Sequence, residues 1–524
     1  MARAGRFVAG LVLAGILSGG AYLAWVSTAG SPHPVDLLPA GALGVAEARG
    51  VEDVARRLSG TRFAATFAQG PTRAWLERTE VMVAFDAVLS DIKRISGFSV
   101  GRDAAFDLLG ADTAVGWYPP AADGATTQPW VAGGRLSLRA WAAATVFRLG
   151  ARLGLGSGLV THEELAGSVL YTFPGAGQPL HVFLAGRVLV AGSDRPLVAM
   201  AARAAGGTGA TVSREPSLQA IRGALPARGD VFVWLRDRIA LTGGLPEGRA
   251  GHGSVGALLR AGETIEIDIA AEAASPPAKP AIAAPQPLPG IALLNRKPLF
   301  FLASREPVPA ALTDLLQNRR SAVAKRSAGA STAAPIQPTS GYAVVITESA
   351  GDAGFFPAPR GLVLIGMASA AEAARALALL YPPGARAAAA GGTQALATRE
   401  SFPLAGEFEL WGAAIGPHLV FATDTSLIDA AAADAGHDTA HAGNGPSWAV
   451  SALATISMDK ALPLVQRWSA PLSGLLAARW PQGPDIARDL GLLAAIGTVR
   501  VAAGSEEHLD RAAITLTVHD LAAR

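Results

Sequence analysis

The chain has 524 residues, of which 50% are hydrophobic and 16% are charged. A chain of this length normally folds into about two or three domains, and this composition excludes an intrinsically disordered protein. The 44 Lys and Arg nearly balance the 42 Asp and Glu, so the composition lacks the charge signature of a nucleic-acid-binding protein. There is no cysteine, which excludes disulfide bonds, thiol catalysis and thiolate zinc sites.

The N-terminal region contains a long apolar segment. Residues 7–26, FVAGLVLAGILSGGAYLAWV, carry no charge. A helix of this length spans about 30 Å, the thickness of a bilayer core, which predicts a transmembrane helix. Arg3 and Arg6 precede the segment, and the next basic residue is Arg49. The positive-inside rule therefore places the N-terminus in the cytoplasm and the rest of the chain outside.

We expect this segment to anchor the protein in the lipid bilayer. The anchor residues that represent it are Phe7, Leu13, Ile16, Tyr22 and Trp25. A cleaved signal peptide is the alternative, because the small residues at 27–29 suit a signal peptidase, but the apolar run is longer than in most signal peptides. The sequence thus predicts a single-pass protein of the bacterial cytoplasmic membrane, with residues 1–30 as cytoplasmic stub and anchor and the bulk in the periplasm.

Residues 31–273 are predicted to form a first α+β module. Its opening, residues 37–58, has the pattern of a strand followed by a helix. Residues 76–98 have apolar side chains at helical spacing, which predicts a helix with one buried face. Residues 263–273 alternate isoleucine with polar side chains. This alternation predicts a half-buried strand that closes the module.

One segment of the first module recurs later in the chain. GRVLVAGSDRPLVAMAARAAGG, residues 186–207, returns as GPHLVFATDTSLIDAAAADAGH, residues 416–437. Each copy has a strand, then Ser or Thr followed by Asp, then an alanine-rich helix. The side chains at these junctions are predicted to cap the helices, because an oxygen there can accept hydrogen bonds from the first-turn N–H groups. These predicted caps are Ser193, Asp194, Thr423 and Asp424. A catalytic carboxylate is the alternative reading.

A second α+β module is predicted over residues 291–524. Residues 274–290 contain six prolines, which predicts an extended linker between the modules. The basic run at 318–326 is interpreted as a solvated loop, and residues 321–341 as a disordered surface loop within the second module. The predicted fold class is therefore α+β: an N-terminal transmembrane helix followed by two tandem related modules with mixed or antiparallel sheets.

Catalytic motifs are missing from the sequence. It contains no Walker loop, GxSxG or HExxH. One stretch, DAGHDTAH, has the spacing of metal ligands, and its candidate ligands are Asp434, His437, Asp438 and His441. Glycines surround this stretch, and the first module has no histidine at the aligned positions. We interpret it as a solvated loop and predict no catalytic residue, cofactor or bound metal.

Three segments carry a family resemblance. They are LLPAGALGVAEA at 37–48, SGFSVGRDAAFDLLGADTAVGWY at 96–118, and RVLVAGSDRPLVAMAARAAGG at 187–207. With the apolar N-terminus, they resemble an uncharacterised group of bacterial membrane-anchored extracytoplasmic proteins, a domain of unknown function. The resemblance covers residues 37–273 best. It implies no activity and no site residues.

The predicted strands and helices are duplicated along this chain, whereas groups of polar residues that could form a catalytic or binding site are not. This pattern predicts a non-enzymatic envelope protein, an interaction or assembly subunit of a membrane or cell-envelope complex, whose partner is another envelope or membrane protein and not a nucleic acid. The alternative is an extracytoplasmic ligand-binding or metal-dependent hydrolytic protein that uses the cleft between the modules.

Overall fold

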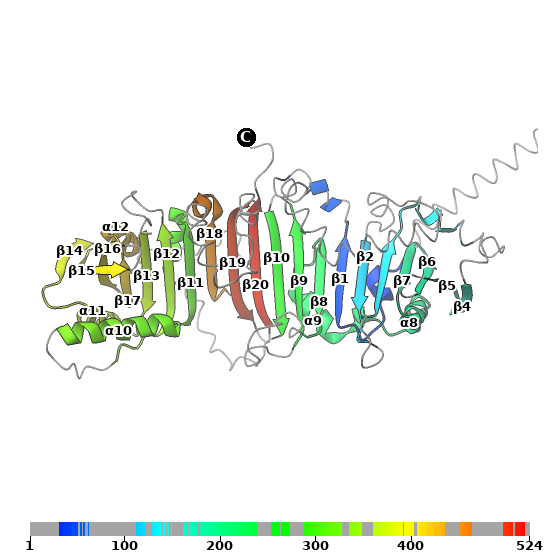
Figure 1. Ribbon diagram of the computed structural model, residues 1–524, viewed down its shortest axis with the longest axis horizontal. Helices are drawn as coiled ribbons and strands as arrows, with labels where there is room; N and C mark the ends of the chain where they lie inside the picture. Colours follow the sequence, from blue (N-terminus) through cyan, green and yellow to red (C-terminus); the bar gives the residue numbers. More distant parts are fainter. Residues whose placement is uncertain are drawn as a thin grey trace, which may run out of the picture. The chain divides into compact units, whose positions relative to one another are not determined.

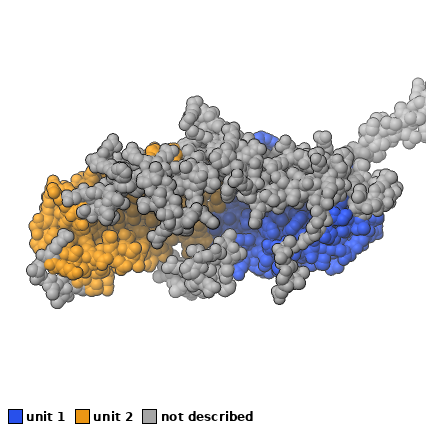
Figure 2. Space-filling model, viewed as in Figure 1, with its two compact units in different colours: residues 1–60, 73–262, 268–274 blue, residues 61–72, 263–267, 275–524 orange. Residues whose placement is uncertain are grey.

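The computed structural model describes residues 31–272 and 288–518, apart from several gaps. The gaps longer than three residues are 62–111, 121–127, 149–160, 175–178, 238–252, 327–334, 348–359, 435–447 and 464–495. The chain divides into two compact units (Figure 2). Unit 1 comprises residues 1–60, 73–262 and 268–274, and unit 2 comprises residues 61–72, 263–267 and 275–524.

The described strands of unit 1 form a sheet whose neighbours pair antiparallel from β4 to β9. In their order across the sheet they are β4 (Thr161–Leu165), β5 (Ser168–Phe173), β6 (Leu180–Ala185), β7 (Val188–Gly192), β3 (Trp130–Arg135), β2 (Asp112–Trp117), β1 (Gly44–Arg49), β8 (Val231–Leu235), β9 (Val255–Ala261) and β10 (Thr264–Glu272). Most consecutive strands are neighbours in the sheet, but β3 pairs with β7 and not with β4, and β8 pairs with β1 and not with β7.

Unit 2 repeats this order with antiparallel neighbours throughout. Its strands are β14 (Arg386–Ala390), β15 (Thr393–Phe402), β16 (Gly406–Ile415), β17 (His418–Ala422), β13 (Arg360–Gly366), β12 (Ser340–Thr347), β11 (Phe300–Pro307), β18 (Ala452–Ser457), β19 (Ile496–Glu506) and β20 (Leu509–Val518). Each strand of unit 1 therefore has a counterpart at the same place in unit 2 (Figure 1).

The predicted α+β class is wrong, because the protein is mostly β. The described residues form twenty strands against five α-helices. Many of these strands are rich in Ala and Gly, residues that give a weak strand signal in a sequence. The strand β14, with the sequence RAAAA, is an example, and it is held by pairing with β15 along its whole length. Cross-strand pairing here overrides local propensity.

Helices cover both faces of the unit 2 sheet. Helix α12 (Thr425–Asp434) packs with apolar side chains of one face, including Leu362 and Val420. Helix α11 (Ala370–Leu380) packs on the other face with Ile365 and Phe421. Because successive residues of a strand point to opposite faces, the neighbours Val420 and Phe421 belong to different cores.

Helix α10 (Ala310–Arg326) lies on the same face as α11 and contacts it. The basic run at 318–326 is therefore the C-terminal half of a helix, and its interpretation as a solvated loop is wrong. The disordered loop predicted over 321–341 is wrong at both ends, since 321–326 are helical and β12 begins at Ser340. A short 3-10 helix, η4 (Ile291–Arg296), precedes β11 in this unit.

Unit 1 also carries helices against its sheet. Helix α8 (Arg195–Ala205) begins after β7 and contacts β6 and β7, with Val198, Ala201 and Ala202 fully buried. Helix α9 (Pro216–Ala224) contacts β9. Shorter helical elements of this unit include the 3-10 helices η1 (Pro34–Leu37) and η2 (Val212–Arg214). Helix α8 thus covers the sheet where β6 and β7 pair.

The prediction of a single-pass membrane helix is not upheld. Among the residues that the structure describes, no helix is both long enough and apolar enough to cross a bilayer. The predicted anchor, residues 7–26, lies outside the described part of the chain. It includes Phe7, Leu13, Ile16, Tyr22 and Trp25. The predicted localisation, with the anchor in the cytoplasmic membrane and most of the chain in the periplasm, depended on that helix and is not upheld either.

Candidate functional site

A groove lies between α10 and the sheet of unit 2. Its volume is about 650 Å³, which is in the range of small-molecule binding pockets. We call it the α10 groove. Its lining residues are Leu312, Leu315, Asn318, Arg319, Ala322, Val323, Val344, Val345, Ile346, Gly361, Leu362, Val363, Ile365, Pro382, Thr398, Glu400, Phe408, Leu410, Phe421, Ala422 and Thr423. Most of these side chains are apolar.

One face of α10 forms the wall of the groove. Leu312, Leu315 and Ala322 recur at helical spacing and line it, as residues about three or four positions apart do on one helix face. Leu316, one position further along, is instead fully buried against α11. Leu315 is 57% exposed. The helix therefore uses one apolar face for its core and presents a second one to the groove.

The floor of the groove is the sheet face that α11 leaves uncovered. In β12, Ala343 and Val345 belong to the core beneath α12, although Val345 also borders the groove. Val344 and Ile346, on the other face of the strand, are half-buried and line the groove. Val363 of β13 continues the floor. Two-residue alternation thus gives these strands one buried apolar face and one accessible apolar face.

Polar side chains gather around Arg319 of α10. Its guanidinium donates from Nη1 to Glu400 Oε1 at 2.7 Å, from Nη2 to Thr398 Oγ1 at 2.6 Å, and from Nε to the Leu380 carbonyl at 3.2 Å. It also stacks 4.7 Å from the centre of the Tyr381 ring. The Arg319 side chain is 13% exposed. A guanidinium this deeply placed needs such partners, because an unpaired buried charge is costly.

Tyr381 supports this cluster from the C-terminal end of α11. Its hydroxyl donates a hydrogen bond to the Leu410 carbonyl at 3.3 Å. Burial raises the pKa of the Tyr381 hydroxyl, although nearby Arg319 opposes the rise. The hydroxyl therefore stays neutral at physiological pH and acts as a structural donor. The charged groups at this part of the groove are Arg319 and Glu400.

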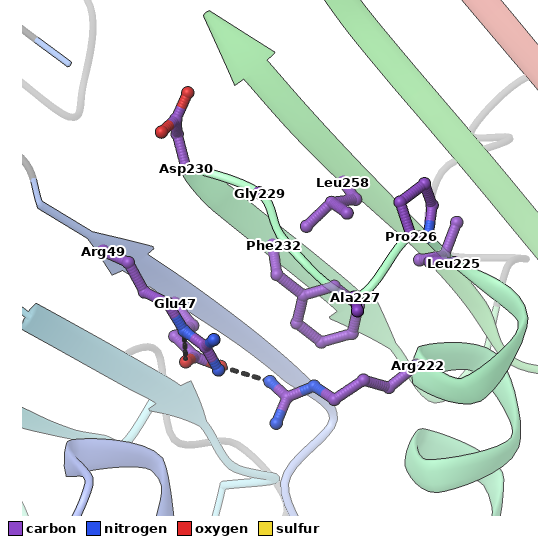
Figure 3. A pocket seen from close by; sticks show the side chains of 10 residues that line it. All are labelled: Glu47, Arg49, Arg222, Leu225, Pro226, Ala227, Gly229, Asp230, Phe232 and Leu258. Carbon is purple, nitrogen blue, oxygen red and sulfur yellow. Dashed lines mark hydrogen bonds and ion pairs between the residues drawn. The ribbon is translucent and has the colours of Figure 1, made fainter.

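Unit 1 contains a second, much smaller cavity of about 40 Å³. Glu47 of β1 lies between two arginines there (Figure 3). Its carboxylate accepts from Arg49 Nε at 2.7 Å and from Arg222 Nη2, and the Arg222 guanidinium lies 4.6 Å from the Phe232 ring centre. Glu47 is 5% exposed. The cavity holds about one water molecule or a few, so we interpret these residues as a buried ion-pair network that joins α9 to the sheet.

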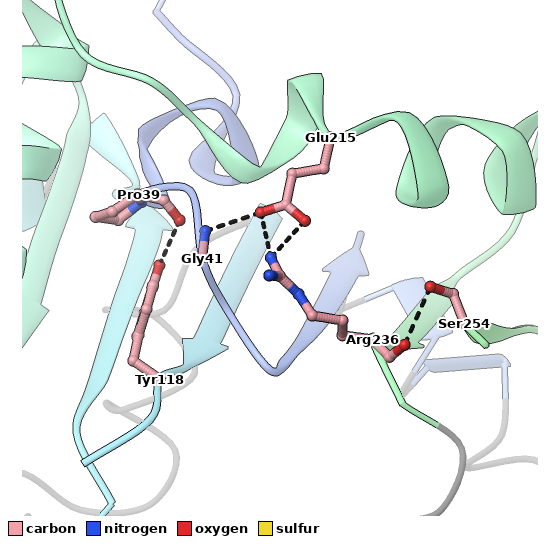
Figure 4. A network of polar contacts seen from close by, with 6 residues as sticks. All are labelled: Pro39, Gly41, Tyr118, Glu215, Arg236 and Ser254. Atoms are coloured by element: carbon pink, nitrogen blue, oxygen red, sulfur yellow. Dashed lines mark hydrogen bonds and ion pairs between the residues drawn. The ribbon is translucent and has the colours of Figure 1, made fainter. Parts of the chain in front are cut away.

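A further polar network ties the N-terminal loop of unit 1 to β8 (Figure 4). Glu215 accepts a hydrogen bond from the Gly41 N–H at 2.8 Å and two from Arg236 at 2.6 Å each. Gly41 has a φ of 90°, which glycine adopts without strain. Nearby, the Tyr118 hydroxyl donates to the Pro39 carbonyl, and burial raises the pKa of this hydroxyl. The network has the geometry of a structural clamp.

The four predicted cap residues divide into two roles. Asp194 accepts a hydrogen bond from the Leu197 N–H at 2.9 Å and Asp424 accepts one from the Ser426 N–H at 2.8 Å, so both aspartates contact the first helical turn. The N–H of Ser426 is also the main cause that lowers the pKa of Asp424. Asp424 forms an additional ion pair with Arg360 at 3.3 Å.

Ser193 and Thr423 bind the neighbouring strand instead of the helix. Ser193 Oγ accepts from the Trp130 N–H at 3.2 Å, and Thr423 Oγ1 accepts from the Gly361 N–H at 3.0 Å. In each unit the Ser or Thr therefore joins the turn before the helix to the start of a sheet strand, and the following Asp contacts the helix.

The predicted metal ligands contribute nothing to the described sites. Asp434 ends α12, while His437, Asp438 and His441 lie outside the described residues. Within the part of the chain that the structure describes, no group of three or more His, Asp or Glu residues could hold a metal ion. The loop DAGHDTAH stays a sequence-based candidate.

Sequence reasoning missed both the α10 groove and its charged residues. Arg319 falls in the basic run that we interpreted as a loop, and Glu400 falls in a strand with no catalytic or metal-binding motif. The available signal was the recurrence of Leu312, Leu315 and Arg319 at helical spacing. The pairing of Arg319 with Glu400 depends on tertiary structure and has no local signature. In comparisons with known proteins, this chain matches no protein-family model, no curated protein and no solved structure.

Proposed function

We propose that the protein is a non-enzymatic binding protein whose ligand is an apolar, chain-shaped molecule held in the α10 groove. The observation that carries this proposal is an apolar groove of about 650 Å³ with a few polar groups. Ligand sites in proteins commonly combine an apolar lining with a small number of placed polar side chains. The proposal keeps the non-enzymatic reading of the sequence, while the role as an assembly subunit stays a prediction.

The groove is open to solvent, since Leu315 in its wall is 57% exposed, so water fills it when no ligand is bound. Displacement of water from its apolar lining favours an apolar ligand by about 25 cal/mol per Å² of buried surface.

The test measures the binding of N-phenyl-1-naphthylamine, a neutral apolar probe whose fluorescence rises out of water. We expect saturable binding to the full chain, and we expect Leu315→Glu to weaken it by about tenfold or more, because the new carboxylate faces an apolar ligand. Leu138→Glu is the matched control, since Leu138 is 46% exposed and lies in unit 1. Absence of saturable binding, or equal loss in both variants, would contradict the proposal.

A further inference from the structure

The two charged residues of the α10 groove, Arg319 and Glu400, differ in how many of their hydrogen-bond donors and acceptors already have partners. Arg319 donates to three acceptors and stacks on an aromatic ring, and it is mostly buried. Glu400 is 34% exposed. Its hydrogen bonds from Arg319 and from Thr398, at 2.7 and 2.9 Å, both go to the same oxygen, Oε1. Oε2 is therefore the carboxylate oxygen best placed to accept a bond from a ligand.

An aromatic side chain accompanies this carboxylate. Phe408 of β16 is the cross-strand partner of Glu400 of β15, and both line the groove. A carboxylate attracts a cation through Coulombic attraction, and a cation that lies over the face of a neighbouring aromatic ring gains cation–π attraction as well. A carboxylate head group has no hydrogen to donate to Glu400 Oε2, and Arg319, the other charged residue that lines the groove, already donates to Glu400, Thr398 and the Leu380 carbonyl.

We infer that the α10 groove binds single-chain amphiphiles with a cationic, hydrogen-bond-donating head group, such as an alkylammonium. The ammonium donates to Glu400 Oε2 beside Phe408, and the hydrocarbon chain lies along the apolar floor that includes Val344 and Val363. This inference rests on the proposed function, because it specifies the chemistry of the ligand that the same groove takes.

The test compares three probes that share a twelve-carbon chain and differ in the head group: dodecylammonium, dodecanol and dodecanoate. Each is titrated below its micelle-forming concentration to displace N-phenyl-1-naphthylamine from the full chain at about 0.1 M salt. We expect dodecylammonium to bind about tenfold more tightly than dodecanoate, with dodecanol between them. We also expect affinity to fall about fourfold for each methylene removed from the chain.

Glu400→Gln tests the role of the carboxylate directly, because glutamine can still accept a bond from Arg319. We expect this variant to lose the preference for dodecylammonium while its affinity for dodecanol stays the same. Glu409→Gln is the matched control, since Glu409 lies on β16, pairs with Arg386 and does not line the groove. Its head-group preference should equal that of the unmodified chain.

Three outcomes would overturn the inference. They are equal affinity for all three head groups, tighter binding of dodecanoate, and unchanged preference in Glu400→Gln. The first two need no variant, so they hold whether or not Glu400→Gln folds. In each of these outcomes the probe still binds, and the proposed function survives. If neither the fluorescent probe nor any amphiphile binds, the proposed function fails instead.

Discussion

Units 1 and 2 share one strand order but fill equivalent positions differently. The two sheets can be aligned residue by residue through their strand registers, starting from the turns that follow β6 and β16. In this alignment Glu47 of β1 occupies the position of Ala303 in β11. His181 of β6 likewise occupies the position of Trp411 in β16. All four side chains are buried, so unit 1 has polar residues where the apolar core of unit 2 continues.

The difference shows that the same strand order accommodates both polar and apolar side chains at equivalent core positions. Each buried polar residue of unit 1 has a partner that unit 2 lacks. Glu47 pairs with Arg222 of α9, and His181 Nδ1 lies 3.0 Å from Thr172 Oγ1. Ala397, the unit 2 counterpart of Thr172, packs beside Trp411 instead. A buried polar side chain is tolerated when it is paired in this way.

Breaking the Glu47 pair should have the largest effect on this comparison. Glu47→Ala leaves the half-buried Arg222 without its carboxylate, and we expect the free energy of unfolding of unit 1 to fall by about 2–3 kcal/mol. Denaturant unfolding followed by tryptophan fluorescence measures the change. The double variant Glu47→Leu with Arg222→Met, which gives unit 1 apolar side chains like those of unit 2, should lose about 1 kcal/mol or less. A loss as large as that of Glu47→Ala would refute our account.

Removing a helix cap should have an intermediate effect in both units. Asp194→Ala deletes the acceptor for the Leu197 N–H, and we expect a loss of about 1 kcal/mol in unfolding free energy. Asp424→Ala should cost a similar amount, because its extra ion pair with Arg360 is partly exposed and adds little. Asn at either position keeps a side-chain oxygen and serves as the control. Equal losses for Asn and Ala would show that capping is not the role of these residues.

The smallest predicted effect is a pH dependence from His181. Burial lowers the pKa of its imidazole, and Arg195 lowers this pKa further, against the opposing charges of Asp194 and Glu163. Below about pH 6.5 the imidazole of His181 therefore binds a proton in the unfolded chain but not in the folded chain. The unfolding free energy should therefore fall as the pH drops from 7 towards the folded pKa, by at most about 1.4 kcal/mol per pH unit.

His181→Gln should reduce this pH slope, which urea unfolding at pH 7 and at pH 5.5 can measure. Burial also lowers the pKa of His418 in unit 2, so His418→Gln should have the same direction of effect on the unfolding of that unit. If the slope of unit 1 is unchanged in His181→Gln, the burial of this imidazole does not govern its titration.

Sequence patterns predicted some elements of the fold because those elements have local signatures. The strand and helix predicted within residues 186–207 form β7 and α8, and those within 416–437 form β17 and α12, at equivalent places in the two sheets. The alternating residues of 263–273 form β10. In each case periodicity within a few residues carries the information.

Other features could not be predicted from local patterns. The α+β class was wrong because strands such as β14, with four alanines, are held by partners and lack β-branched side chains. The α10 groove depends on a helix passing over half-covered strands, and the Arg319–Glu400 pair joins residues of α10 and β15. Contacts of this kind exist only after the chain has folded.

The pairing of β1 with β8 has a consequence for how the protein emerges during synthesis. Ala46 pairs with Val233, so β1 is synthesised long before its partner β8. Closing such long loops slows folding and leaves strand edges open meanwhile. A ribosome-bound chain that ends before Val231 would expose one edge of β1, and chaperone capture should decline sharply once β8 and β9 have been translated.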